Sequence, residues 1–511
     1  MDTMMWRGAL VLVAFVGVAP SFASAQSPTP SSCEALAKVS IAQTTVTLAQ
    51  MIPAGSFQPP TPTAAATPPA PVPGLPSFCR VVARVARTGD TPVDIEVWLP
   101  ARGWNGEFQP SASGFTGGAF SHAAMGDILR KGTATASTNR GHDGGGPWKL
   151  ADMTSQPYHL MVDRAKAILA IYYGTRPQLS LMNECGGGGS RDALQLVQDF
   201  PQDIDAAAAV GFVYDPTHHG IGQWWVYQAT HKDAASYIPP AKYPAIHQAA
   251  LNACDAKDGL KDSVIADPPR CAYDPAVLAC KGADGSDCLT PPQVEAVRKI
   301  YSPAVHARTG RYLFAGMSPG GELRWDAMAG PTPYAYIAGF YRNQVFKDPA
   351  WDYRKQPANF DTHVDLAEAP ANRVIDAMNP DIGPFVDRGG KLLLVGGWND
   401  HTLAPGSFVD YYEAVVKKLG AARVRNAVRL FMVPGMDHCF TPAYKPEYQA
   451  DLEQTLRQWK QTGTAPDQLI VTRIEEGKGP VRQLACAYPR VPHYKGTGDA
   501  TDPRSFECRA P

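Results

Sequence analysis

Hydrophobic and polar residues alternate early in the chain. Residues 81–86 and 93–99 alternate in the manner of paired strands, and residues 131–137 predict a further strand. Residues 163–173 then carry Ala, Ile and Leu at helical spacing. Beyond this point strand patterns are followed by helix patterns, which predicts a parallel sheet with helices on its faces.

Two later strands fit the same sheet. Residues 390–396 and 428–433 are short, mostly apolar runs ended by Gly or Pro, as is typical of parallel strands buried on both faces. Helical patterns follow them at residues 408–419 and 446–462. The predicted fold class is therefore α/β.

The middle of the chain has a different character. Between residues 212 and 379 the strand–helix alternation is lost, Pro, Gly, Trp and Tyr are frequent, and four cysteines fall between Cys254 and Cys288. We predict a core of residues 26–211 and 380–511, interrupted by an inserted domain over residues 212–379. Residues 58–76, built mostly from Pro, Ala and Thr, predict an extended surface loop.

Composition narrows the possible partners. The 511 residues include 47 basic and 48 acidic ones, and 44% are hydrophobic. This balance indicates a globular chain and excludes binding of nucleic acid through bulk positive charge. Ten scattered cysteines, with no paired C-x-x-C spacing, predict disulfides.

The N-terminus indicates export. Arg7 precedes an apolar run over residues 8–18, and Ala23 and Ala25 supply small residues for cleavage. The run is shorter than the roughly 20 apolar residues that span a bilayer. Residues 1–25 are predicted to be a signal peptide of a secreted or periplasmic protein, and no membrane partner is expected.

Two loop residues are the candidate acid and base. Asp400 follows the strand pattern at residues 392–395, and His438 follows the one at 430–433. An acid and then a histidine after successive strands is the order found in α/β-hydrolases, where the nucleophile comes earlier in the chain. Asp400 is therefore predicted to orient His438 as a general base.

The expected nucleophile segment is irregular. Cys185 and four glycines at residues 186–189 separate a short strand from a helix, which suits a sharp turn at a helix N-terminus. The nearest hydroxyl belongs to Ser190. It has Gly188 two residues before it but Asp192 two residues after it, unlike the G-x-S-x-G template.

These segments resemble the tannase/feruloyl esterase family, which includes the mono(2-hydroxyethyl) terephthalate hydrolases. The family pattern is Cys-Ser-x-Gly-Gly, then an Asp, then His-Cys, and residues 93–100, 134–143 and 288–297 are similar to further family segments. The resemblance implies an α/β-hydrolase core, mostly parallel with helices on both faces, and a large inserted lid. It also implies hydrolysis of aromatic esters of phenolic, galloyl, hydroxycinnamoyl or terephthalate-like acids.

The chain departs from the family at the serine. Counted from Cys185, the serine position holds Gly186; counted back from Arg191, it holds Gly187. The segment has one extra residue, and neither glycine offers a nucleophile.

Three hypotheses follow. Ser190 attacks the ester with His438 and Asp400 in an ordinary triad. Alternatively, Cys185 attacks as a thiolate, in a segment that resembles the dienelactone hydrolase elbow. In the third, the chain is a degenerate family member, which acts as a binding protein or by water attack assisted by His438.

A glycine-rich loop is the candidate oxyanion site. Residues 113–118 lie where an α/β-hydrolase supplies one oxyanion N–H, which we assign to Gly114. The second N–H would come from the residue after the nucleophile.

An acidic loop in the lid is the candidate metal site. Asp255, Asp258 and Asp262 are spaced around a glycine and offer the hard oxygen ligands that Ca²⁺ prefers. The resemblance implies a structural calcium, with the carbonyls of Leu260 and Val264 completing its shell.

The resemblance also implies five disulfides. The pairs are Cys33–Cys79, Cys185–Cys439, Cys254–Cys271, Cys280–Cys288 and Cys486–Cys508. The second pair would tie the nucleophile's turn to the histidine loop.

Overall fold

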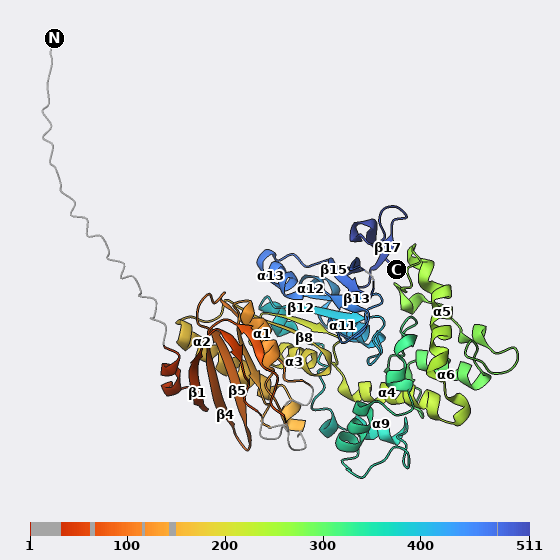
Figure 1. Cartoon of the computed structure of the whole chain (residues 1–511), viewed down its shortest axis with the longest axis horizontal. Coiled ribbons are helices and arrows are strands. Elements are labelled where there is room, and N and C mark those ends of the chain that lie inside the picture. The colour runs from red at the N-terminus through yellow and green to blue at the C-terminus, as the bar shows by residue number, and fades with distance from the viewer. Residues whose placement is uncertain (2–31, 62–66, 115–117, 143–149, 478) are drawn as a thin grey trace.

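A nine-stranded sheet forms the centre of the molecule (Figure 1). The computed structural model describes residues 1, 32–61, 67–114, 118–142, 150–477 and 479–511, so the predicted signal peptide lies outside the described residues apart from Met1. In spatial order the strands are β1 (Thr44–Ile52), β4 (Phe78–Arg87), β5 (Asp90–Pro100), β7 (Ala134–Thr138), β6 (Glu107–Pro110), β8 (Leu179–Cys185), β9 (Ala206–Val210), β12 (Lys391–Gly397) and β13 (Val428–Val433).

The sheet is antiparallel at one end and parallel over the rest. β1, β4, β5 and β7 pair antiparallel, whereas β7, β6, β8, β9, β12 and β13 are joined by parallel pairings. Every residue of β7, β9 and β13 is buried. Parallel strands are usually covered on both faces, so this burial agrees with the parallel sheet predicted from sequence. The architecture is that of an α/β-hydrolase.

Helices cover both faces of the sheet. Leu392 and Leu394 of β12 belong to the core that contains the buried faces of α2 (Gln156–Tyr173), α3 (Gly186–Asp199) and α11 (Gly406–Leu419). The alternate residues Leu393 and Val395 pack in a second core with α13 (Leu452–Thr462). The alternation follows from the period of two along a strand.

Residues 212–379, the predicted lid, contribute no strand to the nine-stranded sheet. They form α4 (Pro216–His231), α5 (Tyr243–Cys254), α6 (Pro291–Tyr301) and α9 (Thr362–Ala367), with shorter helices and the hairpin of β10 (Ala304–Val305) and β11 (Tyr312–Phe314). In Figure 1 these green elements lie together on one side of the core. We keep the name lid for these residues.

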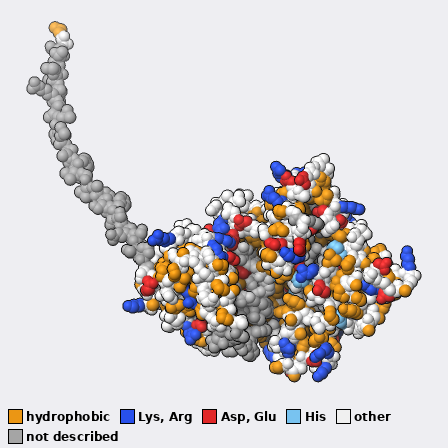
Figure 2. Space-filling view, in the orientation of Figure 1, with side chains coloured by type: hydrophobic (Ala, Val, Ile, Leu, Met, Phe, Trp, Pro, Cys, Tyr) orange, Lys and Arg blue, Asp and Glu red, His pale blue; other side chains and the backbone are white. Residues whose placement is uncertain are grey.

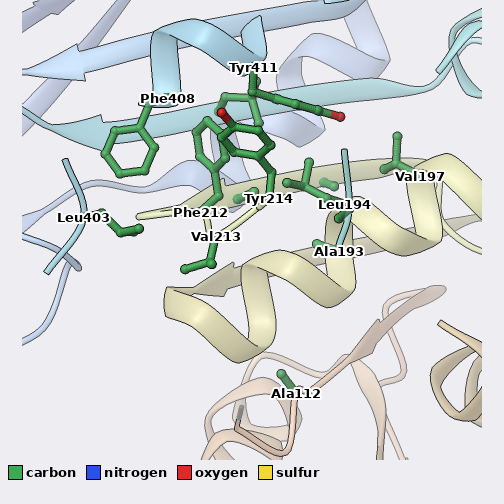
Figure 3. Packing of buried hydrophobic residues seen from close by; sticks show 14 of the residues in the cluster. Ala112, Ala193, Leu194, Val197, Phe212, Val213, Tyr214, Leu403, Phe408 and Tyr411 are labelled. Atoms are coloured by element: carbon green, nitrogen blue, oxygen red, sulfur yellow. The ribbon is translucent and has the colours of Figure 1, made fainter. Parts of the chain in front are cut away.

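Aromatic packing fixes the start of the lid (Figure 3). The Phe212 ring lies 4.8 Å from that of Phe408 on α11, and the Tyr214 ring lies 5.0 Å from that of Tyr411. The chain therefore leaves the sheet in a fixed direction directly after β9.

Several elements differ from those expected. The helix predicted from residue 446 begins at Leu452, where the Asp451 side chain caps it by accepting from Gln454 N at 2.9 Å. The preceding β14 (Glu447–Gln449) instead pairs with β15 (Gln468–Ile474). Within the predicted loop at 58–76, β3 (Val72–Leu75) pairs with β2 (Gly55–Phe57), and residues 62–66 lie outside the described residues.

Figure 2 shows charged side chains of both signs scattered over the visible face. Among the described residues, no helix combines the length and the apolar character needed to cross a bilayer.

Candidate active site

Five strand ends meet at the carboxyl edge of the parallel sheet. Loops leave this edge after β6, β8, β9, β12 and β13, which are neighbours in the sheet. Asp400 follows β12, and His438 follows β13. Parallel strands place these loops together because all their carboxyl ends lie at one edge, where α/β proteins bind ligands.

Asp400 and His438 form a buried hydrogen-bonded pair. His438 Nδ1 lies 2.6 Å from Asp400 Oδ2, and the two residues are 7% and 1% exposed. Asp400 Oδ1 accepts from the backbone N–H groups of Thr402 and Leu403, each at 2.9 Å. The acid is therefore held on both oxygens, and Nε2 of His438 is left for the reaction.

Each partner favours the charged form of the other. Burial alone would raise the pKa of Asp400, but the charge and hydrogen bond of His438 and the two backbone N–H groups outweigh it, so that this pKa is lowered. Burial alone would lower the pKa of His438, yet Asp400 raises it above its ordinary value. The pair is arranged to stabilise an imidazolium.

A glycine behind the ring makes room for His438. Gly211, directly after β9, has φ +50°, and a Cβ atom added there would lie 2.5 Å from the His438 carbonyl oxygen and 2.8 Å from Nδ1. Real side chains do not approach so closely, so this position requires glycine. Gly211 was not predicted from the sequence, where its only signal was a glycine directly after the buried run Ala206–Val210.

The turn after β8 brings Gly186 to the histidine. Gly186 has φ +77° and begins α3, and a Cβ atom added to it would lie 3.3 Å from His438 Nε2. A side chain at this position would therefore start beside the nitrogen that accepts a proton. Gly187 is the second residue of α3. Its backbone N–H lies in the first turn, where N–H groups have no hydrogen-bond acceptor within the helix.

Ser190 is not brought to the histidine. It is fully buried in the first turns of α3, and its hydroxyl donates to the carbonyl oxygen of Gly186 one turn earlier. Among the described residues no hydrogen bond joins Ser190 to His438. Its role as a nucleophile stays a prediction.

Cys185 has no thiol in this structure. It forms a disulfide with Cys439, the residue after His438, and so ties the turn to the histidine loop. The other four pairs implied by the family resemblance are also disulfides here, namely Cys33–Cys79, Cys254–Cys271, Cys280–Cys288 and Cys486–Cys508. The thiolate hypothesis requires this bond to be reduced.

The predicted oxyanion loop is tied to the core. Gly114 is exposed with φ +77°, and its carbonyl accepts from Arg140 at 3.1 Å. The N–H of Ala112 donates to Glu184 Oε1 and that of Ser113 to the Tyr158 hydroxyl, each at 2.8 Å. The N–H groups of Ala112 and Ser113 are therefore already used, and the oxyanion role of Gly114 stays a prediction. Residues 115–117 of the predicted loop lie outside the described residues.

A buried charged group lies beneath this loop and was missed by the sequence analysis. Arg140 forms an ion pair with Asp192 of α3, and its Nε donates to Ser113 Oγ at 3.2 Å. Glu184 faces the same region, where burial raises its pKa to about 8. The group fixes the loop against the helix that begins at Gly186.

A second acid–imidazole pair lies beside the first. His401 Nδ1 is 2.5 Å from Asp437 Oδ1, and Asp437 Oδ2 accepts from Arg324 of the lid at 3.1 Å. The ring of Tyr444 lies 5.5 Å from that of His401 and 5.8 Å from that of His438. On the outer side, Arg324 and Asp437 help to line a cavity of about 280 Å³ between lid and core.

The predicted calcium loop is compact. Asp255 accepts from the N–H groups of Asp262 and Ser263 at 3.2 and 3.1 Å, and Asp258 Oδ1 accepts from Leu260 N at 3.1 Å. Burial, together with the charges of Asp262 and Asp255, raises the pKa of Asp258 to about 7. A cation would relieve this repulsion, so the donors suit Ca²⁺. The carboxylate oxygens of Asp255, Asp258 and Asp262 do not all lie within 4.8 Å of one another. The ligand atoms of Asp400, His401 and Asp437 do.

Comparison with known proteins finds relatives along most of the chain. Residues 79–509 match the family model described as tannase and feruloyl esterase. An uncharacterized esterase of Xanthomonas campestris pv. campestris is 32% identical over 557 aligned positions, covering 98% of this chain and 94% of that protein. A probable feruloyl esterase B of Emericella nidulans is 28% identical, with 84% and 86% covered. The crystal structure of an esterase from Aspergillus oryzae has a TM-score of 0.82 at 25% identity, covering 93% of this chain and 99% of that one.

Proposed function

This chain belongs to the tannase and feruloyl esterase family and is a carboxylic ester hydrolase; on that premise we propose that it hydrolyses aromatic esters with water as the nucleophile. The observation that carries the proposal is the position of Gly186. The complete Asp400–His438 pair faces a residue with no side chain, at the point where a nucleophile would begin. A water molecule is small enough to take the place of a missing hydroxymethyl group.

The protein groups that could attack instead are held away. The Ser190 hydroxyl donates within α3, and Cys185 is bonded to Cys439. Attack by either needs a change in the turn, a new helix register for Ser190 or reduction of the disulfide for Cys185. Labelling of an activated serine and treatment with a reductant distinguish these two routes from attack by water.

In the proposed mechanism, His438 Nε2 removes a proton from water while Asp400 holds the ring through Nδ1. The resulting hydroxide adds to the ester carbonyl carbon. Negative charge then develops on the carbonyl oxygen near the N-terminus of α3, where the N–H of Gly187 and the helix dipole stabilise an anion. Gly114 is proposed as the second donor. The C–O bond to the alcohol breaks, the alcohol oxygen takes up one proton in place of the one that His438 removed from water, and the carboxylic acid and the alcohol are released.

Aromatic side chains near the base favour an aromatic acyl group. Tyr444 packs edge-on against His438. Tyr336 of the lid stacks at 5.2 Å on His219, whose pKa is lowered by burial and is affected by the charges of Asp400 and His438. Aromatic rings bind other rings in edge-on or offset stacking. Phenolic, galloyl, hydroxycinnamoyl and terephthalate-like esters all offer such a ring, and the name of one relative specifies feruloyl esters.

Two further properties belong to the proposal. The five disulfides and the N-terminal pattern fit a protein exported to an oxidising compartment. Asp255, Asp258 and Asp262 would hold a calcium ion with the carbonyls of Leu260 and Val264, and this ion would stabilise the lid.

The test uses the disulfide-bonded protein and the methyl esters of ferulic and gallic acid. We expect hydrolysis by the wild type and by Ser190→Ala, and a loss of about 100-fold or more in His438→Ala. A fluorophosphonate, which labels activated serines, should leave the wild type unlabelled and should label Gly186→Ser. Labelled wild type that loses activity in Ser190→Ala would establish the serine mechanism. Binding of aromatic acids without turnover would instead identify a binding protein.

A further inference from the structure

Two acid–imidazole pairs each join the loop after β12 to the loop after β13. Asp400 and His401 are neighbours in the loop after β12, and Asp437 and His438 are neighbours in the loop after β13. Each acid bonds to the histidine of the other loop, at 2.6 Å for His438 and 2.5 Å for His401. Hydrolysis by a serine triad uses one such pair, so the second needs a separate explanation.

The second pair has the internal arrangement of the first. His401 and Asp437 are 7% and 3% exposed. The Asp437 carboxylate holds His401 both through Nδ1 and through the backbone N–H at 3.2 Å, and Arg324 holds its other oxygen. An imidazole fixed through Nδ1 presents Nε2 for proton transfer. Among the described residues no hydrogen bond involves His401 Nε2.

The two imidazoles lie in one group. Both rings pack against Tyr444, and the ligand atoms of Asp400, His401 and Asp437 all lie within 4.8 Å of one another. Such a group could hold a metal, but the oxygens are already used. Asp400 accepts from His438 and from two backbone N–H groups, and Asp437 accepts from His401 and Arg324. The arrangement suits proton transfer better than ligation of a cation.

Direct attack by water creates a task for a second imidazole. The attacking and departing oxygens are bonded to the same tetrahedral carbon, and His438 is committed to the side where the proton is removed. An alkoxide of an ordinary alcohol leaves slowly unless a proton reaches its oxygen as the bond breaks. A second imidazole can supply this proton without waiting for the first to turn toward it.

We propose that His401 is this proton donor, an inference that rests on the proposed water mechanism. His438 Nε2 accepts a proton from water, and the new C–O bond forms to the carbonyl carbon. The bond to the alcohol oxygen then breaks with its electron pair. That oxygen takes the proton from Nε2 of His401, which begins the cycle as an imidazolium held by Asp437 and is left as a neutral imidazole. The acid product and the alcohol account for all the atoms of the ester and of one water. Proton transfer from His438 through water to His401 restores both groups.

The test compares two esters of one aromatic acid that differ only in the leaving group. Methanol needs a proton to leave, whereas 4-nitrophenolate does not. In His401→Gln, kcat for the methyl ester should fall about 100-fold, and kcat for the 4-nitrophenyl ester less than about threefold. Asp437→Asn should show the same dependence to a smaller extent. His438→Ala, which removes the base, should slow both esters alike.

Several results would overturn the proposal. Equal losses on both esters in His401→Gln would make His401 a positioning residue, and equal retention would make it a structural one. His401→Asn provides a second variant if His401→Gln does not fold, with the thermal midpoint and the disulfide content as folding checks. If the wild type hydrolyses neither ester, the proposed function fails together with this inference. If the wild type hydrolyses both esters and His401→Gln hydrolyses both at the same rates, only this inference fails.

Discussion

A Cβ atom added to Gly186 would lie 3.3 Å from Nε2 of His438. The turn after β8 thus places Gly186 beside the base. Its φ of +77° suits a sharp strand-to-helix turn like that of a nucleophile elbow, but glycine has no reacting side chain. The surrounding apparatus is intact, since the acid, the base and the Cys185–Cys439 disulfide are all in place. The chemistry of this chain therefore depends on what fills the space between these two residues.

Gly211→Ala should displace His438. The new Cβ atom would meet the ring nitrogen Nδ1 at 2.8 Å and the His438 carbonyl oxygen at 2.5 Å, so the histidine loop has to shift. A misplacement of about 1 Å at a catalytic group costs about 100-fold in rate, and we expect a loss of that order in kcat/KM. The matched control is Gly463→Ala at the end of α13, where φ is +70° but nothing lies within 4 Å of the added atom. Equal activity in the two variants would contradict the prediction.

Removing the Cys185–Cys439 disulfide should lower both stability and activity. The bond closes a loop of 254 residues, and its loss in the double Ser variant should cost about 2–5 kcal/mol of unfolding free energy. His438 adjoins Cys439, so its placement should suffer as well. Removing Cys280–Cys288, which closes an 8-residue loop in the lid, should leave hydrolysis unchanged. Activation by a reductant would instead support Cys185 as a thiolate nucleophile.

The rate of hydrolysis of the 4-nitrophenyl ester, whose leaving group needs no proton, should rise with pH. Only neutral His438 can accept a proton from water, and Asp400 raises its pKa above the ordinary value of 6.5, so the midpoint of kcat/KM against pH should lie above 6.5. Asp400→Asn removes the stabilising charge. The midpoint should then move to lower pH, while the maximal rate falls by about 10³–10⁴-fold because the ring loses its orientation. A variant that titrates at the same pH as the wild type would show that Asp400 does not control His438.

Calcium should reverse the pH dependence of lid stability. The folded protein binds the proton of Asp258 more tightly than the unfolded chain, with a pKa of about 7 against 3.8, so its contribution to stability is full below pH 3.8 and is lost as the pH rises to about 7. In a chelator the thermal midpoint should fall over this range. Added Ca²⁺ at about 100 times its Kd should restore about 2.7 kcal/mol at neutral pH.

Asp258→Asn is the matched variant for this site. It should remove much of the pH dependence in chelator and weaken the response to calcium, because a neutral amide neither repels Asp262 nor offers a charge to the ion. Thermal midpoints of the wild type that do not change on addition of calcium at pH 7 would count against the site.

The sequence by itself determined several strands and helices of the core and the residues that follow two of the strands. Apolar runs at 390–396 and 428–433 predicted β12 and β13, and Asp400 and His438 lie in the loops after them. These loops were expected to meet because parallel strands of a sheet have their carboxyl ends at one edge. The resemblance supplied the five disulfide pairs that the structure contains. β9 escaped prediction because alanine has little preference for strands, and burial between β8 and β12 decided its conformation.

Only the tertiary structure decided which side chains meet. Ser190 is four residues from Gly186, and the helix that begins there turns its hydroxyl back to the Gly186 carbonyl. Asp400 and Asp437 each precede a histidine in the chain, yet each bonds to the histidine of the other loop. Such contacts depend on how separate loops fold over one sheet edge, a relationship that spacing along a single chain does not contain.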